Sequence, residues 1–293
     1  MSDIERNGNS AVRNKIQTAA MEVLCCNANG KFQQQADKVA REEPLEIRVR
    51  GRSIAVTMRT PGQDRELAAG FLLTEGIIHK RSDLIEMGPC QQGNSAANIL
   101  NAFLAPRIEV DFARLTRHVF ASSSCGLCGK ASIDAVHQNF PAIESELKVT
   151  SRTLLQLPGR MRAAQRTFEE TGGLHAAAIF SAEGNLVALQ EDIGRHNAVD
   201  KVIGDGLLKD VLPFSAHILL VSGRASFEIM QKALAARVPV ICAISAPSNL
   251  AVDFAKESGQ TLVGFLRERT MNIYAGAERI QPEKERRRAR PRD

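Results

Sequence analysis

The chain has 293 residues, of which 44% are hydrophobic and 24% are charged, a composition typical of a globular protein in water. It contains no Trp and one Tyr, so it lacks the aromatic platform on which proteins stack the bases of single-stranded nucleic acids. The formal net charge of +5 comes largely from the tail EKERRRARPRD. Because the remainder is close to neutral, a duplex-binding surface is not indicated, whereas small anionic ligands are compatible with it.

The cysteine content and the absence of long apolar runs indicate the cellular compartment. The cysteines are too few for a disulfide scaffold in a chain of this length. They are Cys25, Cys26, Cys90, Cys125, Cys128 and Cys242. No apolar run has the length of a membrane span, and the polar N-terminal segment is unlike a signal peptide. We therefore expect a cytoplasmic protein with reduced thiols and with neither a membrane nor a nucleic acid as its partner.

The first part of the chain predicts a flexible extension followed by a few strands and a helix. Residues 1–40 combine a polar start, a short amphipathic helix and a polar linker, which together predict a flexible N-terminal extension. Apolar and polar residues alternate over 45–58, as in a β-hairpin with one buried face. Asp64 is the predicted cap of a helix over 65–76, and IEVDF (108–112) is a predicted strand.

After residue 170 the pattern changes to apolar strands that alternate with amphipathic helices. The predicted strands are the hairpin 175–189, then 217–222, 238–245, 261–266 and 271–276; the predicted helices are 197–208, 226–237 and 249–259. This alternation predicts an α/β layer with a largely parallel sheet that is covered by helices on both faces.

We divide the chain into four parts on this basis. Residues 1–40 are the extension, and 41–150 are an N-terminal α+β part that ends in a CxxC loop and its helix. Residues 151–280 are the α/β core, and 281–293 are a disordered basic tail.

The segment ASSSCGLCGK places Cys125 and Cys128 in a glycine-rich loop before a predicted helix. The unpaired N–H groups and the dipole of a helix N-terminus lower the pKa of a thiol and favour the nucleophilic thiolate. A structural zinc site would need two more ligands, and none stands at a suitable spacing. A thioredoxin-like redox pair and a sulfur carrier that holds a persulfide both remain, because the spacing alone does not separate them.

TGGLHAAAIF resembles part of the zinc deaminase signature, in which H-x-E is followed by P-C-x-x-C. Here Ala177 occupies the position of the catalytic glutamate, and the CxxC precedes His175. Without that carboxylate the proton transfer is not possible, so a working deaminase is not expected. A related fold without metal is compatible with the motif, and the simplest interpretation of His175 is a packed histidine at a strand start.

Three polar loops follow predicted strands, where open α/β sheets bind their ligands. The first carries an ionisable cluster of Glu191, Asp192, Arg195, His196, Asn197, Asp200 and Lys201. The second contains Gly223 and Arg224 before a helix N-terminus, an arrangement suited to an anion. The third is FLRERT (265–270). Together they predict a pocket for a phosphorylated or nucleotide-like ligand.

Seven segments, taken together, resemble the FdhD family of formate dehydrogenase accessory sulfurtransferases. They are REEPLEIRVRGR, SSSCGLCG, TGGLHAAAIF, EDIGRHNAVDKVIG, SGRASFEIMQKA, APSNLAV and TLVGFLR, in the same order, over residues 40 to 276. The resemblance implies an α/β fold with a cytidine-deaminase-like core that lacks catalytic zinc and is preceded by a smaller N-terminal α+β part.

The resemblance also implies a function. A cysteine desulfurase loads sulfur onto Cys125 as a persulfide, Cys128 assists the relay, and the sulfur passes to the molybdenum bis(guanine dinucleotide) cofactor before it enters formate dehydrogenase. This cofactor is cargo, and no structural metal is implied. The family's cofactor-binding stretch falls on Phe265, Leu266, Arg267, Glu268, Arg269 and Thr270, with the second arginine displaced by one position. A homodimer is also implied. The alternatives are a CxxC dithiol oxidoreductase and a non-catalytic chaperone that only holds the cofactor.

Overall fold

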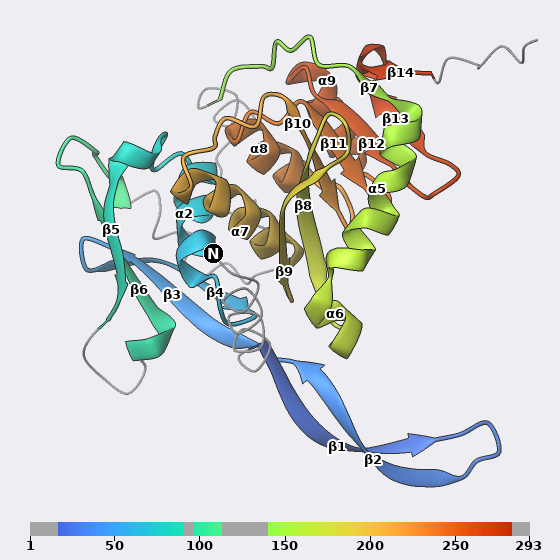
Figure 1. Ribbon diagram of the computed structural model, residues 1–293. Coiled ribbons are helices and arrows are strands. Elements are labelled where there is room, and N and C mark those ends of the chain that lie inside the picture. Colours follow the sequence, from blue (N-terminus) through green and yellow to red (C-terminus); the bar gives the residue numbers. More distant parts are fainter. Residues whose placement is uncertain (1–16, 91–95, 113–139, 283–293) are drawn as a thin grey trace, which may run out of the picture.

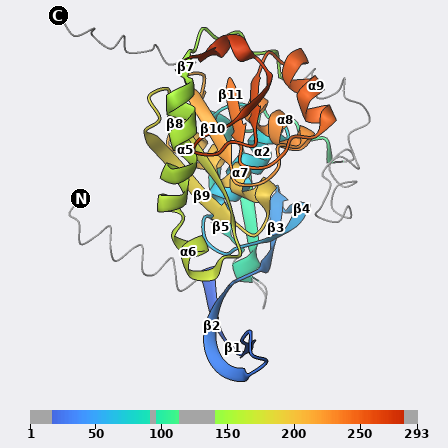
Figure 2. The same cartoon turned by 90° about the vertical axis from the view of Figure 1, so that its right-hand side faces the viewer.

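A computed structural model describes residues 17–90, 96–112 and 140–282, and in these residues a layer of helices separates two β-sheets (Figure 1). A further helix covers the outer face of the larger sheet, and a β-hairpin projects away from the body (Figure 2). Within the described ranges, no helix combines the length and apolarity needed to cross a membrane.

The projecting hairpin consists of β1 (Thr18–Cys26) and β2 (Phe32–Ala40), which pair antiparallel along their full length. The helix and linker expected before residue 40 are therefore wrong over 18–40. The reason is the turn between the strands, where the Asn27 side chain accepts hydrogen bonds from two backbone N–H groups and Gly30 adopts a left-handed φ of 72°. The division of the chain at residue 40 stays a prediction.

The smaller sheet has the strand order β4-β3-β6-β5. Its strands are β3 (Glu43–Val49), β4 (Arg52–Arg59), β5 (Leu84–Pro89) and β6 (Ile99–Leu104). The β3–β4 hairpin confirms the alternation seen in the sequence, because Leu45, Ile47 and Val49 are buried and lie on one face. The strand predicted at 108–112 is wrong: this segment has no sheet partner, and the carbonyl of Ile108 accepts a hydrogen bond from the Arg50 side chain instead.

Helix α2 (Asp64–Thr74) packs on the inner face of this sheet. Its N-cap residue is Gln63, and Asp64 does not cap it. The Asp64 carboxylate instead forms two hydrogen bonds of 2.9 Å with the guanidinium of the buried Arg59. A charge-assisted bidentate pair with a buried arginine is stronger than a single capping bond, which explains the difference from the sequence prediction.

The larger sheet has the order β13-β12-β11-β10-β8-β9. Its strands are β8 (His175–Ser181), β9 (Leu186–Asp192), β10 (His217–Val221), β11 (Val240–Ala243), β12 (Thr261–Gly264) and β13 (Asn272–Ala275). Only the central β10, β11 and β12 are parallel, and the outer pairings are antiparallel. The sheet is mixed but not largely parallel, because short connections such as the turn between β8 and β9 join antiparallel strands.

Alternate residues of β8, β10 and β11 pack into two separate hydrophobic cores, one on each face of the larger sheet. On one face, Ile179, Leu219 and Ile241 pack with α2 and with helices α7 (Arg195–Leu208), α8 (Phe227–Ala235) and α9 (Asn249–Glu257). On the other face, Ala178, Leu220 and Cys242 pack with α5 (Ser151–Ala164). The short α6 (Arg166–Thr171) follows α5, and a two-stranded pair of β7 (Val149–Thr150) and β14 (Ile280–Gln281) closes that side.

Helices α2 and α7 cross in direct backbone contact at two glycines, Gly70 and Gly204. A Cβ atom added to Gly70 would lie 1.8 Å from the carbonyl oxygen of Asp200, and one added to Gly204 would lie 1.8 Å from that of Glu66. Only glycine permits this approach. The crossing joins the N-terminal part to the α/β core.

Candidate functional site

The two cysteines predicted to carry the chemistry, Cys125 and Cys128, lie outside the described residues, so the dithiol stays a prediction. Among the described cysteines, Cys242 is fully buried in β11, and this burial raises the pKa of its thiol. Because the nucleophile is the thiolate, Cys242 is a core residue and not a sulfur acceptor. Cys25 and Cys26 are exposed on the hairpin, outside the segments that carry the resemblance.

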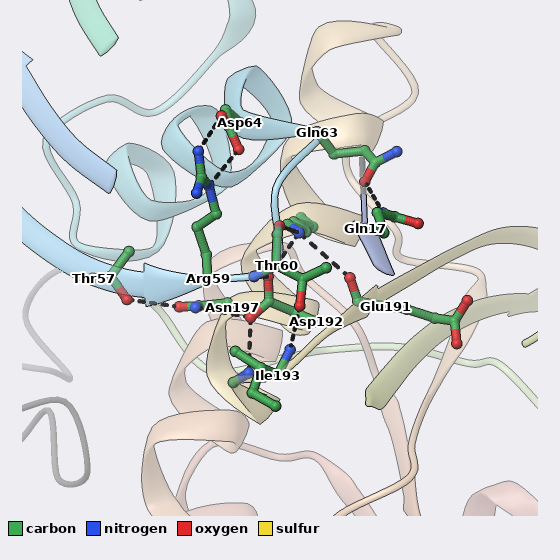
Figure 3. A network of polar contacts seen from close by, with 12 residues as sticks. Gln17, Thr57, Arg59, Thr60, Gln63, Asp64, Glu191, Asp192, Ile193 and Asn197 are labelled. Carbon is green, nitrogen blue, oxygen red and sulfur yellow. Dashed lines mark hydrogen bonds and ion pairs between the residues drawn. The ribbon is translucent and has the colours of Figure 1, made fainter. Parts of the chain in front are cut away.

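Most of the ionisable cluster predicted to bind a ligand after β9 is structural (Figure 3). Asp192 and Lys201 are both 0% exposed and form an ion pair of 2.7 Å. Asp192 also accepts a hydrogen bond from the backbone N–H of Thr60, and Lys201 donates to the carbonyl of the same residue. Asn197 donates to Asp192 and to the Met58 carbonyl. These bonds tie the end of β4 to the start of α7.

Two more members of the cluster have buried partners. Asp200 pairs with Lys232 of α8 at 2.8 Å and accepts a hydrogen bond from Thr74 of α2. Burial opposes the charge of Lys232, but the carboxylates of Asp200, Glu75 and Glu228 outweigh it and raise the pKa of Lys232. Glu191 accepts hydrogen bonds from the first backbone N–H groups of α6, and burial raises its pKa. The sequence could not distinguish these packing roles from ligand binding.

His196 is the member that faces the start of α8. Its Nε2 atom lies 3.3 Å from the Glu228 carboxylate and 3.4 Å from the Ser226 hydroxyl. The carboxylate favours the protonated ring, but burial and the positive charges of Lys232 and Arg195 act against it. The pKa of His196 is lowered to about 3. His196 is therefore neutral at physiological pH.

We expect His196→Gln to reduce the acid sensitivity of the fold. An imidazole with a pKa of about 3 in the folded state and 6.5 in the unfolded state binds its proton only on unfolding, so its neutral form stabilises the fold above pH 6.5 and that stability is lost as the pH falls. Between pH 7.5 and pH 5, the wild type should lose about 2 kcal/mol more unfolding free energy than the variant. Urea unfolding at both pH values measures this. Asp200, whose pKa burial raises to about 6, acts in the opposite direction but is common to both proteins. Equal losses of unfolding free energy in the wild type and the variant would contradict the lowered pKa of His196.

A pocket of about 1290 Å³ opens at the carboxyl ends of the parallel strands. Ser222 after β10, Ile244 after β11 and Leu266 after β12 line it, together with His175 at the start of the antiparallel β8. The opposite wall comes from α5 and α6. The position agrees with the rule that α/β sheets bind ligands at this edge, and the volume is large enough for a nucleotide.

The loop after β12 forms part of the pocket rim. Leu266, Arg267, Glu268 and Arg269 line the pocket, whereas Phe265 and Thr270 are not in its lining. Phe265 has a left-handed φ of 49°, which is unusual for a bulky side chain, and it is 42% exposed. The Arg267 side chain is held by the carbonyl of Ile244, and its backbone N–H donates to Thr270. Backbone outliers of this kind gather at functional sites, because the surrounding structure holds them in place.

The wall from α5 and α6 is the part of the site that was missed in the sequence. Arg162 stacks on the ring of Phe168 at 4.6 Å and pairs with Glu169 at 2.7 Å. Gln165 is only 5% exposed, and its side chain has no hydrogen-bond partner among the described residues. The spacing of the buried Leu154, Leu157 and Met161 is a helical signal, but Pro158 within it is unusual in a helix interior.

Gly223 and Arg224, also predicted to bind the ligand, do not line this pocket but lie beside it. A Cβ added to Gly223 would be 3.5 Å from the His175 ring and 3.6 Å from Arg195 Cδ. The Nε atom of Arg195 is buried and has no hydrogen-bond partner in the described part of the chain, and Arg224 is exposed. Burial lowers the pKa of His175, and Arg195 lowers it further. His175 thus forms the boundary between the pocket and this basic patch of Arg195 and Arg224.

The arrangement is suited to a ligand with an anionic part and a flat polar part. Arg269 and Arg224 have no ion-pair partner among the described residues, so they are available to phosphate. The side chains of Phe168, Leu174 and Leu266 make the interior of the pocket apolar. Across the described ranges, no group of three or more His, Cys, Asp or Glu side chains is arranged to hold a metal ion.

Comparisons with known proteins agree on one family. The FdhD/NarQ family profile matches residues 40–281. The sulfur carrier protein FdhD of Streptomyces coelicolor is 50% identical over 259 residues, covering 86% of this chain and 92% of that protein. The protein of the same name from Saccharolobus solfataricus is 42% identical over 248 residues, covering 84% of this chain and 91% of its own.

A solved structure has the same fold. The crystal structure of a protein from Desulfotalea psychrophila, described as a formate dehydrogenase accessory protein, superimposes with a TM-score of 0.72. It covers 90% of this chain and 100% of its own, at 24% identity. This likeness shows the mixed α/β fold.

Proposed function

Because the chain belongs to the FdhD/NarQ family, we propose that it is a sulfur carrier that serves formate dehydrogenase. It accepts sulfur from a cysteine desulfurase on Cys125 and passes it to the molybdenum bis(guanine dinucleotide) cofactor before the cofactor enters the enzyme. The names of its relatives support the sulfur-carrier role. The observation that carries the cofactor part is the pocket at the strand ends, whose rim contains Arg267, Glu268 and Arg269.

The sulfur enters by thiol–persulfide exchange. The Cys125 thiolate attacks the outer sulfur of the desulfurase persulfide; the donor S–S bond breaks, a new S–S bond forms on Cys125, and the donor cysteine leaves as a thiolate. No net oxidation occurs in this step.

Release of the sulfur is assigned to Cys128. Its thiolate attacks the Cys125 sulfur, the outer sulfur leaves as hydrosulfide and becomes a ligand of the cargo metal, and a Cys125–Cys128 disulfide remains. The two electrons that reduce the sulfur come from the two thiols, so a thiol reductant such as thioredoxin or glutathione must restore the dithiol.

The pocket is the place where the cofactor binds in this proposal. Arg269 is free to contact phosphate, and the apolar interior beside Phe168 accepts a flat base. The metal-bearing pterin end then extends from the pocket, where a persulfide can reach it. We also infer that the mixed sheet is a cytidine-deaminase-like core. Ala177, which is buried in β8 at the position of the deaminase glutamate, supports a version of that core without deaminase chemistry.

The test is to incubate the protein with a cysteine desulfurase and cysteine and to map any gain of one sulfur atom by mass spectrometry. We expect the gain on Cys125, its loss in Cys125→Ala and its retention in the control Cys90→Ala. Cys128→Ala should keep the persulfide but fail to release it. Formate dehydrogenase that matures normally with Cys125→Ala would instead support a cofactor chaperone. A stable Cys125–Cys128 redox couple that never accepts sulfur would support a dithiol oxidoreductase.

A further inference from the structure

The Glu268 carboxylate lines the pocket and has no ion pair or hydrogen bond among the described residues. The other pocket carboxylate, that of Glu169, already forms an ion pair with Arg162 at 2.7 Å. The neighbouring Arg267 is held by the carbonyl of Ile244 and does not pair with Glu268. Among the described residues that line the pocket, Glu268 is therefore the carboxylate available to a ligand.

A free carboxylate only accepts hydrogen bonds at neutral pH, and it repels phosphate. Its ligand partner must therefore be a hydrogen-bond donor. In a nucleotide the donors are the ribose hydroxyls and the N–H groups of the base. Guanine has N1–H and an exocyclic N2 amino group side by side, and this pair matches the two oxygens of a carboxylate. Adenine has an acceptor, N1, at the corresponding position, and a carboxylate repels it.

The surroundings of Glu268 favour a flat ring over a sugar. A Cβ added to Gly159 of α5 would lie 3.6 Å from Glu268 Oε1, so a wall without a side chain adjoins the carboxylate. Gly172 and Gly173 also line the pocket. The Phe168 ring, with Arg162 on one face, adds a planar surface, and planar groups stack well on such surfaces. The amide of Gln165, nine-tenths buried and without a partner among the described residues, can serve the remaining polar edge of a base.

We infer that Glu268 is the residue that selects guanine over adenine in this pocket, by accepting hydrogen bonds from N1–H and the N2 amino group. The inference rests on the proposed function, which makes a guanine dinucleotide the cargo. Arg269, on the same loop, takes the phosphates. Bidentate recognition of a base typically discriminates by about 1–3 kcal/mol, so GDP should bind roughly 5- to 150-fold more tightly than ADP.

The experiment measures the dissociation constants of GDP and ADP by titration calorimetry on the full chain, because each nucleotide carries the same ribose and diphosphate. In Glu268→Gln, the affinity for GDP should fall about tenfold while that for ADP stays the same or rises. The matched control is Glu169→Gln, which changes the paired carboxylate of the same pocket and should preserve the GDP preference. Arg269→Ala should weaken both nucleotides by the same factor.

The outcomes separate this inference from the function on which it rests. The inference is wrong if the wild type binds GDP and ADP equally, or if Glu268→Gln weakens the binding of both by the same factor. The Glu268 carboxylate would then contact the ribose or no part of the ligand, but the pocket would still be a nucleotide site. If neither nucleotide binds the wild type, the assignment of the pocket to the cofactor fails as well. Sulfur loading on Cys125 tests the carrier role independently of both results.

Discussion

Gly204→Ala is expected to lower the free energy of unfolding by about 3 kcal/mol or more. The added methyl group would lie 1.8 Å from the Glu66 carbonyl oxygen and 2.6 Å from the backbone nitrogen of Gly70. Both are backbone atoms of α2, so no side-chain rotation relieves the clash and the helices must separate. Their separation also disturbs the start of α7, where His196 lies.

Urea unfolding of the variant and the wild type measures this loss of unfolding free energy. Gly70→Ala should lose a similar amount, because its methyl group would lie 1.8 Å from the Asp200 carbonyl oxygen. Gly88→Ala is the matched control. A Cβ at Gly88 meets nothing within 4 Å, and the φ of Gly88 is not in the left-handed region. Gly88→Ala should therefore change the free energy of unfolding by less than about 1 kcal/mol. Similar stabilities for Gly204→Ala and Gly88→Ala would show that the helices do not cross this closely.

Lys201→Met is expected to destabilise the protein by about 3–5 kcal/mol, because it leaves the Asp192 carboxylate buried without a cation. Both side chains are 0% exposed, and water cannot replace the lost partner. The same change removes the hydrogen bond to the Thr60 carbonyl at the end of β4. The N-terminal part should therefore loosen from the core before the core itself unfolds.

A double-mutant cycle with Asp192→Asn separates the ion pair from the packing. If the cost of Lys201→Met comes from an unpaired charge, the double variant should be more stable than the sum of the two single changes predicts. Hydrogen exchange should show the largest loss of protection at the end of β4 and in α2. Additive effects of the two substitutions would mean that the charges are not coupled.

The alternation of small polar loops with apolar segments was sufficient to predict most elements after residue 170, because each buried strand and each helix has its own periodicity. The same reasoning predicted a ligand site at one edge of the sheet, since loops that follow parallel strands share one edge, and the structure has a pocket there. It also singled out the loop over 265–270. Leu266, Arg267, Glu268 and Arg269 do line the pocket there.

The roles predicted for several polar side chains were wrong for one physical reason: a sequence pattern does not reveal the partner of a polar group. Asp64 has the chemistry of a helix cap but pairs with Arg59. Asp192, Asp200 and Lys201 have the chemistry of a binding site but lie buried against α2, α8 and the end of β4. Some of these pairings join residues more than a hundred positions apart, such as Thr74 and Asp200, and local spacing carries no information about them.

By itself, the sequence determined the α/β class, the succession of strands and helices, the family resemblance and the reactive dithiol as a hypothesis, since all of these depend on local periodicity or on contiguous motifs. Only the tertiary structure decided which charges are buried pairs and which remain free. It also supplied the wall of α5 and α6 opposite the strand ends, where Gln165 and Phe168 meet residues 266–269 across the pocket. The reason is that a pocket is a relation between distant surfaces, and folding alone brings those surfaces together.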